Sequence, residues 1–527
     1  MGNTLVFLPE AVLVATALAS ALLGFAWSKR PAALWGLALT GAVVSLVLTF
    51  DLMGLGLTHA LGLDLWNLVA DPAQGDFTAE PTNLRMRVDA FSLFFHVIFL
   101  FVAILAILAS RGFLKREEPH QAEYYALMLL AVVGMMFTAA ATDLIVLFLA
   151  FETSSLSTFA LVAFRKKDAN ATEAAVKFFI IGAVSSAIIL FGISILYGVV
   201  DSQGSARATD LDWLRASLTY GSYQEFEAPL VIALVFLIAG FGFKVATVPF
   251  HMWAPDVYHG SPTTVSAFLA AGSKKVGIVA LFKVFLVGLI GIQVDWVLAI
   301  AVLAIATQTV GNILAIPQRS VKRMLAYSSI AQAGYILIAL PVGAVALQDA
   351  SNPLARDVAV AAIVGALLHV LMHAAMKGGA FLVVAGVETR GIPDDVEAYR
   401  GLSKRMPFFA FSMTILLLSL AGIPPLGGFF SKFILFSSAV SAMPFNGWYL
   451  ALAVSGVLNS ALSLYYYARV IWYMYILEPE AGASRIDAPR SIGAAVLVAV
   501  AVVLLASFVM FFLVAYLTQA ATVFFGF

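Results

Sequence analysis

The sequence predicts an all-α polytopic membrane protein with about fourteen transmembrane helices, of which the seventh and the twelfth are discontinuous. Three observations carry this prediction. The 527-residue chain is 62% hydrophobic and only 11% charged, whereas soluble domains are about a quarter charged. Its apolar residues fall into windows of about 20, the length that a helix needs to cross the hydrocarbon core of a bilayer. Prolines and glycines interrupt two of these windows, and a proline inside a helix breaks or kinks it.

The apolar windows divide the chain in order. Three lie within 1–110, near 4–26, 32–56 and 91–110. The first begins LVFLPEAVLV and has neither a basic start nor a small-residue cleavage site, so we expect it to be retained as a helix. Five windows fill 123–287, five fill 294–476, and the last lies near 491–518. The ten central windows lie near 123–141, 143–164, 173–199, 228–259, 263–287, 294–315, 321–341, 358–387, 407–438 and 447–476.

The two interrupted windows occupy the same place in the two groups of five. The seventh window, 228–259, would be about 45 Å long as a single helix, which is too long for a simple crossing. Lys244 stands at its midpoint, and Pro249 follows five residues later. The twelfth window holds AGIPPLGGFFSKF, whose prolines and glycines break the helix just before Lys432. Interrupted helices in corresponding halves of a chain indicate a transport site, so we expect an internal repeat.

Lysine and arginine are unequally divided between two sets of loops. Seventeen follow odd-numbered windows and five follow even-numbered ones. Cytoplasmic loops are enriched in these residues, so we expect the odd loops on the cytoplasmic side and both termini on the opposite side. The first set is Lys29, Arg30, Arg111, Lys115, Arg116, Arg165, Lys166, Lys167, Arg319, Lys322, Arg323, Arg390, Arg400, Lys404, Arg405, Arg485 and Arg490, and the second is Arg85, Arg87, Arg207, Arg215 and Arg356.

Composition and missing motifs exclude several classes of function. The net charge is zero, which argues against a nucleic-acid partner. The chain has no cysteine, so it cannot form disulfides and lacks the thiolates that hold most iron–sulfur clusters. It contains no dinucleotide-binding glycine motif after a strand, no phosphate-binding loop and no haem attachment motif. We therefore expect the chain to act without a cofactor of its own.

Glu152 lies near the centre of the fifth window, where an ionisable side chain is expensive and is usually functional. One interpretation pairs it with Lys244. The carboxylate would favour the charged lysine while burial favours the neutral amine, so moving the carboxylate away would release a proton. The alternative is a structural glutamate that hydrogen-bonds to Ser154 or Ser155.

Two further windows carry buried basic residues. Lys274 lies at the centre of the eighth window, and Lys275 lies about 100° around the helix, so we expect only one of them to face the interior easily. Partial snorkelling along the aliphatic stem and a functional role are both open for Lys275. In HVLMHAAMKGG, residues His369, His373 and Lys377 recur every four positions and stack on one helix face. Histidine titrates near neutral pH, so this stack predicts a proton relay, and the lack of accompanying carboxylates argues against a metal site.

Other polar residues are less specific. Lys177 is nearer the start of the sixth window, so snorkelling toward the cytoplasmic side and a functional role are both open. His251 and His259 flank the sequence WAPDVY in the broken region and are candidates for an access path on the outer side. Asp256 is a candidate cap for the short helix after Pro255.

Four stretches resemble a known family, the antiporter-like proton-pumping membrane subunits of respiratory complex I and its relatives. They are FKVATVPFHMWAPDVYHGSPTTVSAFLAAGSK, SVKRMLAYSSIAQAGYILI, KFFIIGAVSSAIILFGISILYG and GIPPLGGFFSKF, and the resemblance covers roughly residues 90–475. WAPDVYHGSPT and GSK are most similar to the subunit-N type of NADH–quinone oxidoreductase. The resemblance implies fourteen helices, two inverted five-helix repeats, broken seventh and twelfth helices, and a polar axis across the membrane middle.

The resemblance also implies site residues. The family's glutamate in the fifth helix falls on Glu152, and its lysines in the seventh, eighth and twelfth helices fall on Lys244, Lys274 and Lys432. A lysine at the last position fits the N type rather than the M type, which carries glutamate there. The stretch HVLMHAAMKGGAF departs from this pattern, because it is more similar to the L type and to Mrp-type sodium/proton antiporter subunits.

The expected function is that of a proton-translocating subunit in a complex that oxidises NADH, or a related donor, and reduces quinone. The resemblance implies that FMN, iron–sulfur clusters and quinone are bound by partner subunits. Subunits of an Mrp-type sodium/proton antiporter or of a membrane-bound hydrogenase-like or ferredoxin-linked complex are the alternatives. A passive scaffold is disfavoured, because it has no use for a row of buried lysines.

The expected setting is the plasma membrane, or inner membrane, with lipid around the chain and other membrane-arm subunits on both flanks. About ten residues follow the last window, too few for the long C-terminal arm of the family's L type. We therefore expect an inner place in a membrane arm, with Lys432 as the link to one neighbour.

Overall fold

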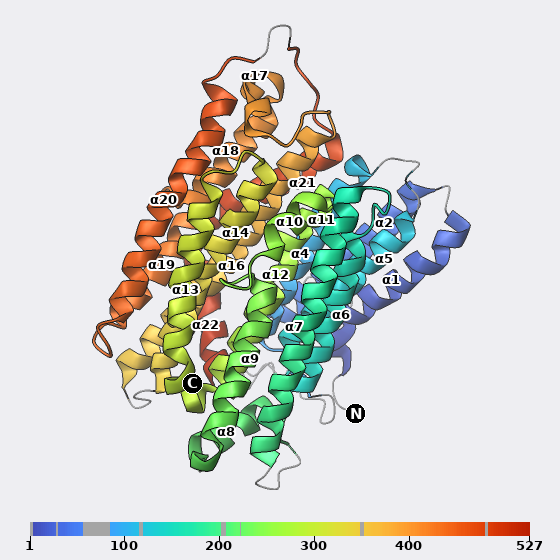
Figure 1. Cartoon of the computed structure of the whole chain (residues 1–527). Helices are drawn as coiled ribbons and strands as arrows, with labels where there is room; N and C mark the ends of the chain where they lie inside the picture. The colour runs from blue at the N-terminus through green and yellow to red at the C-terminus, as the bar shows by residue number, and fades with distance from the viewer. Residues whose placement is uncertain are drawn as a thin grey trace.

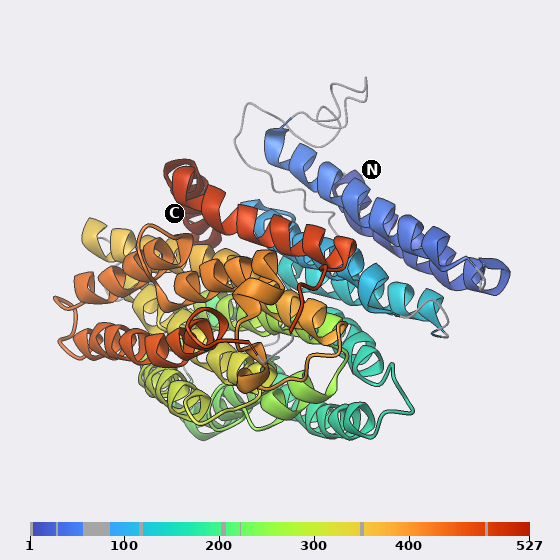
Figure 2. The ribbon, with the colours of Figure 1, turned by 90° about the horizontal axis from the view of Figure 1, so that it is seen from above.

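A computed structural model describes residues 4–27, 30–55, 85–114, 118, 120–201, 207–221, 223–347, 352–479 and 483–526. Long helices run side by side through the whole height of the molecule (Figure 1), and seen from above the N-terminal helices form one edge of the bundle (Figure 2). Both chain ends lie at the lower end in Figure 1, where α8 also lies. Termini at one end agree with the predicted even number of crossings. The N-terminal helices are α1 (Leu8–Trp27), α2 (Pro31–Phe50) and α4 (Ala90–Phe113).

The first group of five crossings is built from eight helices and two π-helical turns, counted within the described residues. They are α5 (Gln121–Ala140), α6 (Leu144–Val162), α7 (Ala169–Asp201), the surface helix α8 (Leu211–Tyr220), α9 (Glu227–Val245), α10 (Trp253–Gly260), α11 (Thr263–Phe268), η5 (Leu269–Ser273), α12 (Lys274–Lys283) and η6 (Val284–Gly288). The segment from α11 to η6 is continuous, and we call it the central helix. It forms the eighth crossing, as the sequence predicts.

The second group follows the same order. It consists of α13 (Gln293–Ala315), α14 (Val321–Leu337) with α15 (Ala339–Gly343), α16 (Pro353–Glu388), α18 (Pro407–Ala421), α19 (Gly427–Ser441) and α20 (Tyr449–Tyr475), with the short α17 (Leu402–Arg405) in a loop. Thirteen helices of the described part are long and apolar enough to cross a membrane. The broken pair α18 and α19 supplies one more crossing, which confirms the predicted fourteen.

Both predicted breaks are present. The helix α9 ends at Val245, because the C-cap residue Ala246, three residues before Pro249, has a left-handed backbone (φ 58°). The carbonyl of Phe243 accepts from the backbone N–H of Ala246 and also from the indole of Trp253 in α10, each at 2.9 Å, so a side chain from across the break adds a second hydrogen bond at the end of α9. In the second break α18 ends at Ala421, and its C-cap residue Gly422 has φ 88°. The break in the seventh helix thus lies about one turn before Pro249, where the sequence predicts it. Lys244 therefore lies in the last turn of α9 and not in the middle of a helix.

Glycines allow close helix contacts at matching places in the two groups. A Cβ on Gly134 of α5 would lie 2.5 Å from the backbone nitrogen of Ser154 in α6. A Cβ on Gly311 of α13 would lie 2.6 Å from the backbone nitrogen of Ala331 in α14. These contacts join the first two helices of each group, and they support the repeat of 123–287 and 294–476, which stays a prediction.

The end of the chain differs from expectation. The last crossing, α21 (Arg490–Phe508), is followed after Val509 by a further helix, α22 (Met510–Phe525). The ring of Phe524 stacks on Phe91 of α4 with centroids 4.4 Å apart, and the hydroxyl of Tyr516 donates to the carbonyl of Ala90 at 3.1 Å. The predicted window 491–518 therefore spans two helices and not one, because the chain leaves the helical conformation at Val509 and α22 packs on α4.

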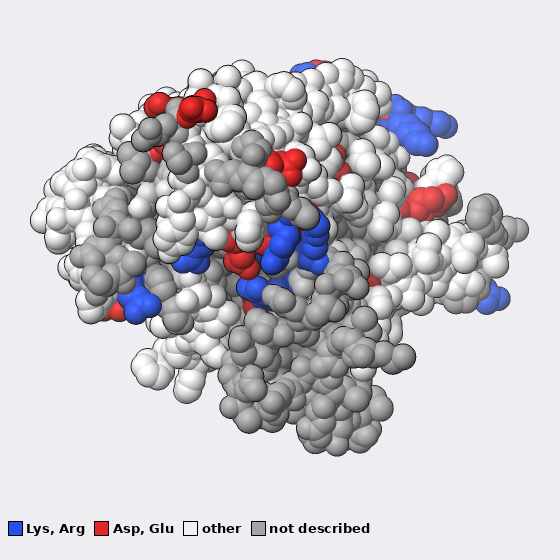
Figure 3. Space-filling view, turned by 90° about the horizontal axis from the view of Figure 1, so that it is seen from below, with Lys and Arg blue, Asp and Glu red and all other residues white. Residues whose placement is uncertain are grey.

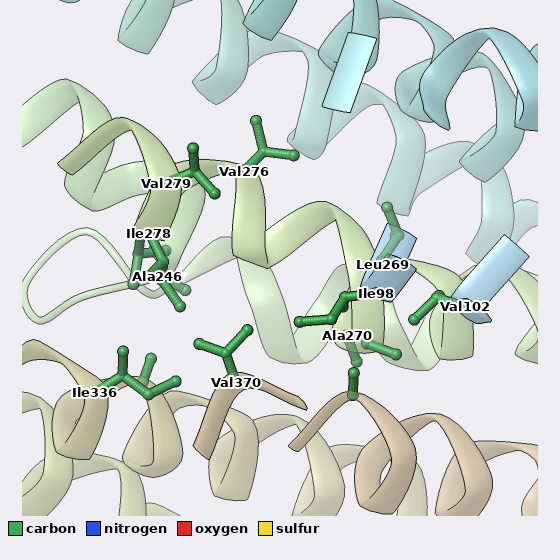
Figure 4. Packing of buried hydrophobic residues seen from close by; sticks show 14 of the residues in the cluster. Ile98, Val102, Ala246, Leu269, Ala270, Val276, Ile278, Val279, Ile336 and Val370 are labelled. Carbon is green, nitrogen blue, oxygen red and sulfur yellow. The ribbon is translucent and has the colours of Figure 1, made fainter. Parts of the chain in front are cut away.

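The central helix lies in the middle of the hydrophobic core. Figure 4 shows Leu269 and Ala270 beside Ile98 of α4, and Val370 of α16 approaching from another side. All residues of its most apolar stretch are buried. A polar side chain on any face of this helix therefore meets protein and not lipid.

Candidate functional site

Seven basic side chains are buried in the middle of the bundle. None is more than 3% exposed, and none forms an ion pair with a carboxylate within the described part of the chain. They are Lys244, Lys274, Lys275, His369, His373, Lys377 and Lys432. We call this set the basic row. Buried charges are normally paired with an opposite charge. A set of amines and imidazoles without carboxylate partners is therefore a candidate site of proton transfer.

Glu152 and Lys244 lie at one end of the basic row without touching each other. The carboxylate of Glu152 accepts from the hydroxyl of Ser186 in α7 at 2.7 Å. The amine of Lys244 donates to Ser155 at 3.0 Å and lies 5.4 Å from the ring centroid of Phe151. The two side chains form no ion pair in this conformation, and the electrostatic pairing of Glu152 with Lys244 stays a prediction. Ser154 and Ser155 are not the partners of the carboxylate, because Glu152 is turned toward α7. Ser155, which binds the Lys244 amine, lies one turn from Glu152 on α6.

Lys274 and Lys275 are both buried, which contradicts the prediction that only one faces the interior. Lys274 donates to the carbonyl of Ser329 in α14 at 3.0 Å. Lys275 donates to the carbonyl of Ala270 at 2.9 Å and makes a short contact with Nδ1 of His373 in α16. Snorkelling is excluded because the central helix is enclosed by protein on every side, so a second lysine meets another helix instead of lipid.

If the chain translocates protons, as the sequence predicts, we expect Lys275→Met to lower proton pumping as strongly as Lys274→Met, since each replaces a buried amine with its own partner by an apolar side chain of similar length. Pumping would be measured in proteoliposomes that contain the intact complex. A matched control is Lys167→Met, because Lys167 is exposed on the α6–α7 loop. A defect in Lys274→Met but not in Lys275→Met would show that only Lys274 takes part in proton transfer.

The stack on α16 links the central helix to the second break. The rings of His369 and His373 have centroids 6.4 Å apart. His369 contacts Ser431 of α19 through Nδ1 and the side-chain carbonyl of Gln332 through Nε2, each at 2.9 Å. Lys377 donates to Ser328 of α14 at 2.6 Å. The two histidine rings lie close together on one face of α16, as predicted, and the stack contacts α12, α14 and α19.

Lys432 lies across the second break from the end of α18. Its amine donates to the carbonyl of Leu420 at 2.7 Å and to Ser460 of α20 at 2.9 Å. The amide of Gln332 donates to the same Leu420 carbonyl at 3.2 Å. His369 and Lys432 are thus joined through Gln332 and one backbone carbonyl. A groove of about 470 Å³, lined by Lys432 and by apolar residues such as Phe433, opens beside it.

Sequence reasoning missed the neutral partners of the basic row. Ser328, Gln332, Ser431 and Ser460 bind members of the row, and Ser186 binds the neighbouring Glu152. A serine in a membrane helix carries little signal, because its hydroxyl can bond to the carbonyl of the preceding turn. Gln332 does carry a recognisable signal in the sequence, since a side-chain amide in the membrane-spanning stretch YSSIAQAGYIL needs hydrogen-bond partners.

Lys177 belongs to a separate ion-pair cluster near the start of α10. It pairs with Glu173 at 2.7 Å and with Asp256 at 2.8 Å, and it is 41% exposed. Asp256 also accepts from Arg323 of α14 at 2.8 Å. Asp256 therefore joins α7 to α14 and does not cap α10, whose N-terminus has no side-chain cap. His259 lies 3.6 Å from Asp394 in the same region.

His251 stands in the first break and is 6% exposed. Neither ring nitrogen has a hydrogen-bond partner among the described residues. Within the same residues no group of three or more histidine, cysteine or acidic side chains is arranged to hold a metal ion. The chemistry that this arrangement supports is the holding and passing of protons between nitrogen atoms.

The comparison with known families gives one match over residues 141–459, to a family model described as "NADH:quinone oxidoreductase/Mrp antiporter, TM". F(420)H(2) dehydrogenase subunit N of Methanosarcina mazei is 43% identical over 96% of this chain and 95% of that protein. NADH-quinone oxidoreductase subunit N of Trichlorobacter lovleyi is 41% identical over 75% of both chains. A chain in the structure of respiratory complex I from Thermus thermophilus is 29% identical, with a TM-score of 0.72 over 96% of this chain and 98% of that chain.

Proposed function

The chain belongs to the transmembrane family of NADH:quinone oxidoreductases and Mrp antiporters, and from this premise we propose that it is the proton-translocating membrane subunit of a redox-driven complex. The observation that carries the proposal is the basic row, seven buried groups with no carboxylate partner in the described residues. Relatives that are 41–43% identical over most of the chain bear the name subunit N of a dehydrogenase or of a quinone oxidoreductase. This chain moves protons, and the oxidation and reduction belong to other subunits.

The contacts within the basic row suggest how protons are held. Lys275 and Nδ1 of His373 are in direct contact, so one proton can be shared between them, while two would place like charges side by side. A proton that arrives at one end therefore favours release at the other. Gln332 and the Leu420 carbonyl orient His369 and Lys432, and the surrounding core excludes bulk water from the steps between.

Both ends of the row reach the outer surface of the chain. Glu152, which stands next to the Lys244 end of the row, is half-buried between α6 and α7, and Lys432 at the other end lines the apolar groove beside α19 and α20. Exposed Phe179 and Phe433 lie near these two ends. We infer that other membrane subunits of the complex cover these two flanks and that lipid covers the remainder. A charge that moves in a neighbouring subunit then changes the electrostatic potential at one end of the row.

FMN, iron–sulfur clusters and quinone would be held by partner subunits. This chain has no cysteine to ligate a cluster. Of the relatives compared, one is named for F(420)H(2) and another for NADH and quinone. We therefore infer that the partner subunits, and not this chain, determine which hydride donor the complex oxidises.

Purification of the native complex tests the proposal. We expect flavoproteins and iron–sulfur proteins to co-purify with this chain, and donor oxidation by the complex in proteoliposomes to acidify or alkalinise the lumen. NADH and reduced F420 would be compared as donors. The main rival is a subunit of an Mrp-type sodium/proton antiporter, because the family model covers both. A complex without redox proteins that exchanges Na⁺ for H⁺ would establish that rival.

The proposed location is the plasma membrane, with both termini on the non-cytoplasmic side. Reporter fusions after Lys167, Arg323 and Arg405 are expected to be cytoplasmic, because the basic loops lie there. A fusion after Phe527 is expected on the opposite side. Both readings would be made in intact cells with a reporter active on one side only, and a cytoplasmic C-terminal reporter would contradict the orientation.

A further inference from the structure

A buried lysine outside the basic row lies near the end of the central helix. Lys283 is the last residue of α12 and is 5% exposed. It is nine residues beyond Lys274, or about 14 Å along the helix axis. Its amine donates to the carbonyl of Ala141 at 2.8 Å, and it forms no ion pair with a carboxylate within the described ranges. The mechanism proposed above does not use this group.

Lys283 lines a cavity at the lower end of the bundle. The cavity has a volume of about 80 Å³, which gives room for a few water molecules. Charged side chains from the start of α4 and from α8 line it as well: Arg87, Asp89, Asp212 and Arg215. Figure 3 shows basic and acidic side chains gathered together in the middle of this lower face. The amine is thus approached through a charged, water-sized space from one face of the membrane.

A purely structural role explains only part of this arrangement. Ala141 is the C-cap residue of α5, and a cation near a helix C-terminus is stabilising. A capping amine needs no charged cavity beside it. In addition, π-helical turns stand immediately before Lys274 and immediately after Lys283, and such turns are frequent at functional sites.

We propose that this cavity is an aqueous access path from the lower membrane face, and that Lys283 exchanges protons with water in it. The inference rests on the proposed function. In the step, the N–H bond of the lysine ammonium breaks, a cavity water takes the proton, and the neutral amine remains to be protonated from the side of Lys274. The negative charges of Asp89 and Asp212 attract the proton into the cavity after it leaves Lys283. The positive charges of Arg87 and Arg215 keep it from staying bound in the cavity.

Accessibility is tested first, because it does not depend on pumping. This chain has no native cysteine, so single cysteines can be placed in it without removing any. In sealed vesicles that contain the complex, Thr142→Cys and Val287→Cys are expected to react with a charged, membrane-impermeant thiol reagent added on the side of α8 only, since both residues line the cavity. Val279→Cys, one turn deeper on α12 and 0% exposed, is the control that should stay unlabelled. Labelling no faster than that of Val279→Cys would overturn the access path.

The proton role is tested with two substitutions. Lys283→Arg keeps the positive charge and the contact with the end of α5, but an arginine does not give up its proton. We expect both Lys283→Arg and Lys283→Met to lower pumping at least about tenfold in assembled complex. Normal pumping in Lys283→Arg would establish a capping role and end the proposal. If the unmodified complex does not pump protons, both the proposed function and the proton role of Lys283 are wrong. The cysteine labelling still tests the access path in that case, because it does not depend on pumping.

Discussion

Replacing Lys244 by alanine is expected to lower proton pumping and coupled quinone reduction together, at least about tenfold, while the complex stays assembled. Lys244 is 2% exposed in the last turn of α9, next to the first break. Its amine is held by Ser155 and by aromatic rings and not by a carboxylate. The lysine can therefore change protonation without breaking an ion pair, and alanine removes that capacity.

Two further variants separate this effect from misfolding. Lys244→Met keeps most of the buried volume and should show the same loss, whereas Lys167→Ala on the exposed loop should pump normally. Pumping would be followed with a pH-sensitive dye in proteoliposomes, at equal amounts of assembled complex. Normal pumping in Lys244→Met would remove this lysine from the path.

Glu152→Gln tests the neighbouring charge. Glutamine can still accept from Ser186, whose hydroxyl lies 2.7 Å from the carboxylate, so the contact between α6 and α7 survives. We expect pumping to fall because the negative charge near Lys244 is lost, and Glu152→Asp to retain part of the activity because the charge persists. Equal activity in Glu152→Gln and the unmodified chain would assign the residue a structural role.

The substitution Gly428→Ala is expected to have the largest structural effect. A Cβ at this position would lie 1.9 Å from the backbone oxygen of Ser419, so α18 and α19 would have to separate at the second break. Overpacking of this kind costs about 1–3 kcal/mol or more. The shift would also move Lys432, one turn further along α19, away from the Leu420 carbonyl.

The expected readouts are a lower thermal midpoint of the complex and reduced pumping in the fraction that assembles. Gly447→Ala is the matched control, since a Cβ there meets nothing within 4 Å. An unchanged midpoint in Gly428→Ala would show that the backbone at the break can yield, and would contradict the assigned role of the close contact.

Most of the candidate site was open to prediction because charged residues in apolar windows are conspicuous. Glu152, Lys244, Lys274, Lys432 and the α16 stack all stood out in this way. Lys283 did not, because it lies near the end of its window, where a lysine normally reaches the membrane surface.

By itself the sequence determined the fourteen crossings, the two breaks and the basic row. Crossing a bilayer requires about 20 consecutive apolar residues, and this is a local property that any window of the chain displays. Only the tertiary structure decided the partner of each charge: Ser186 for Glu152, Ser155 for Lys244 and His373 for Lys275. These partners lie on other helices or on other turns, and whether a helix face meets lipid or protein depends on packing between segments far apart in the chain.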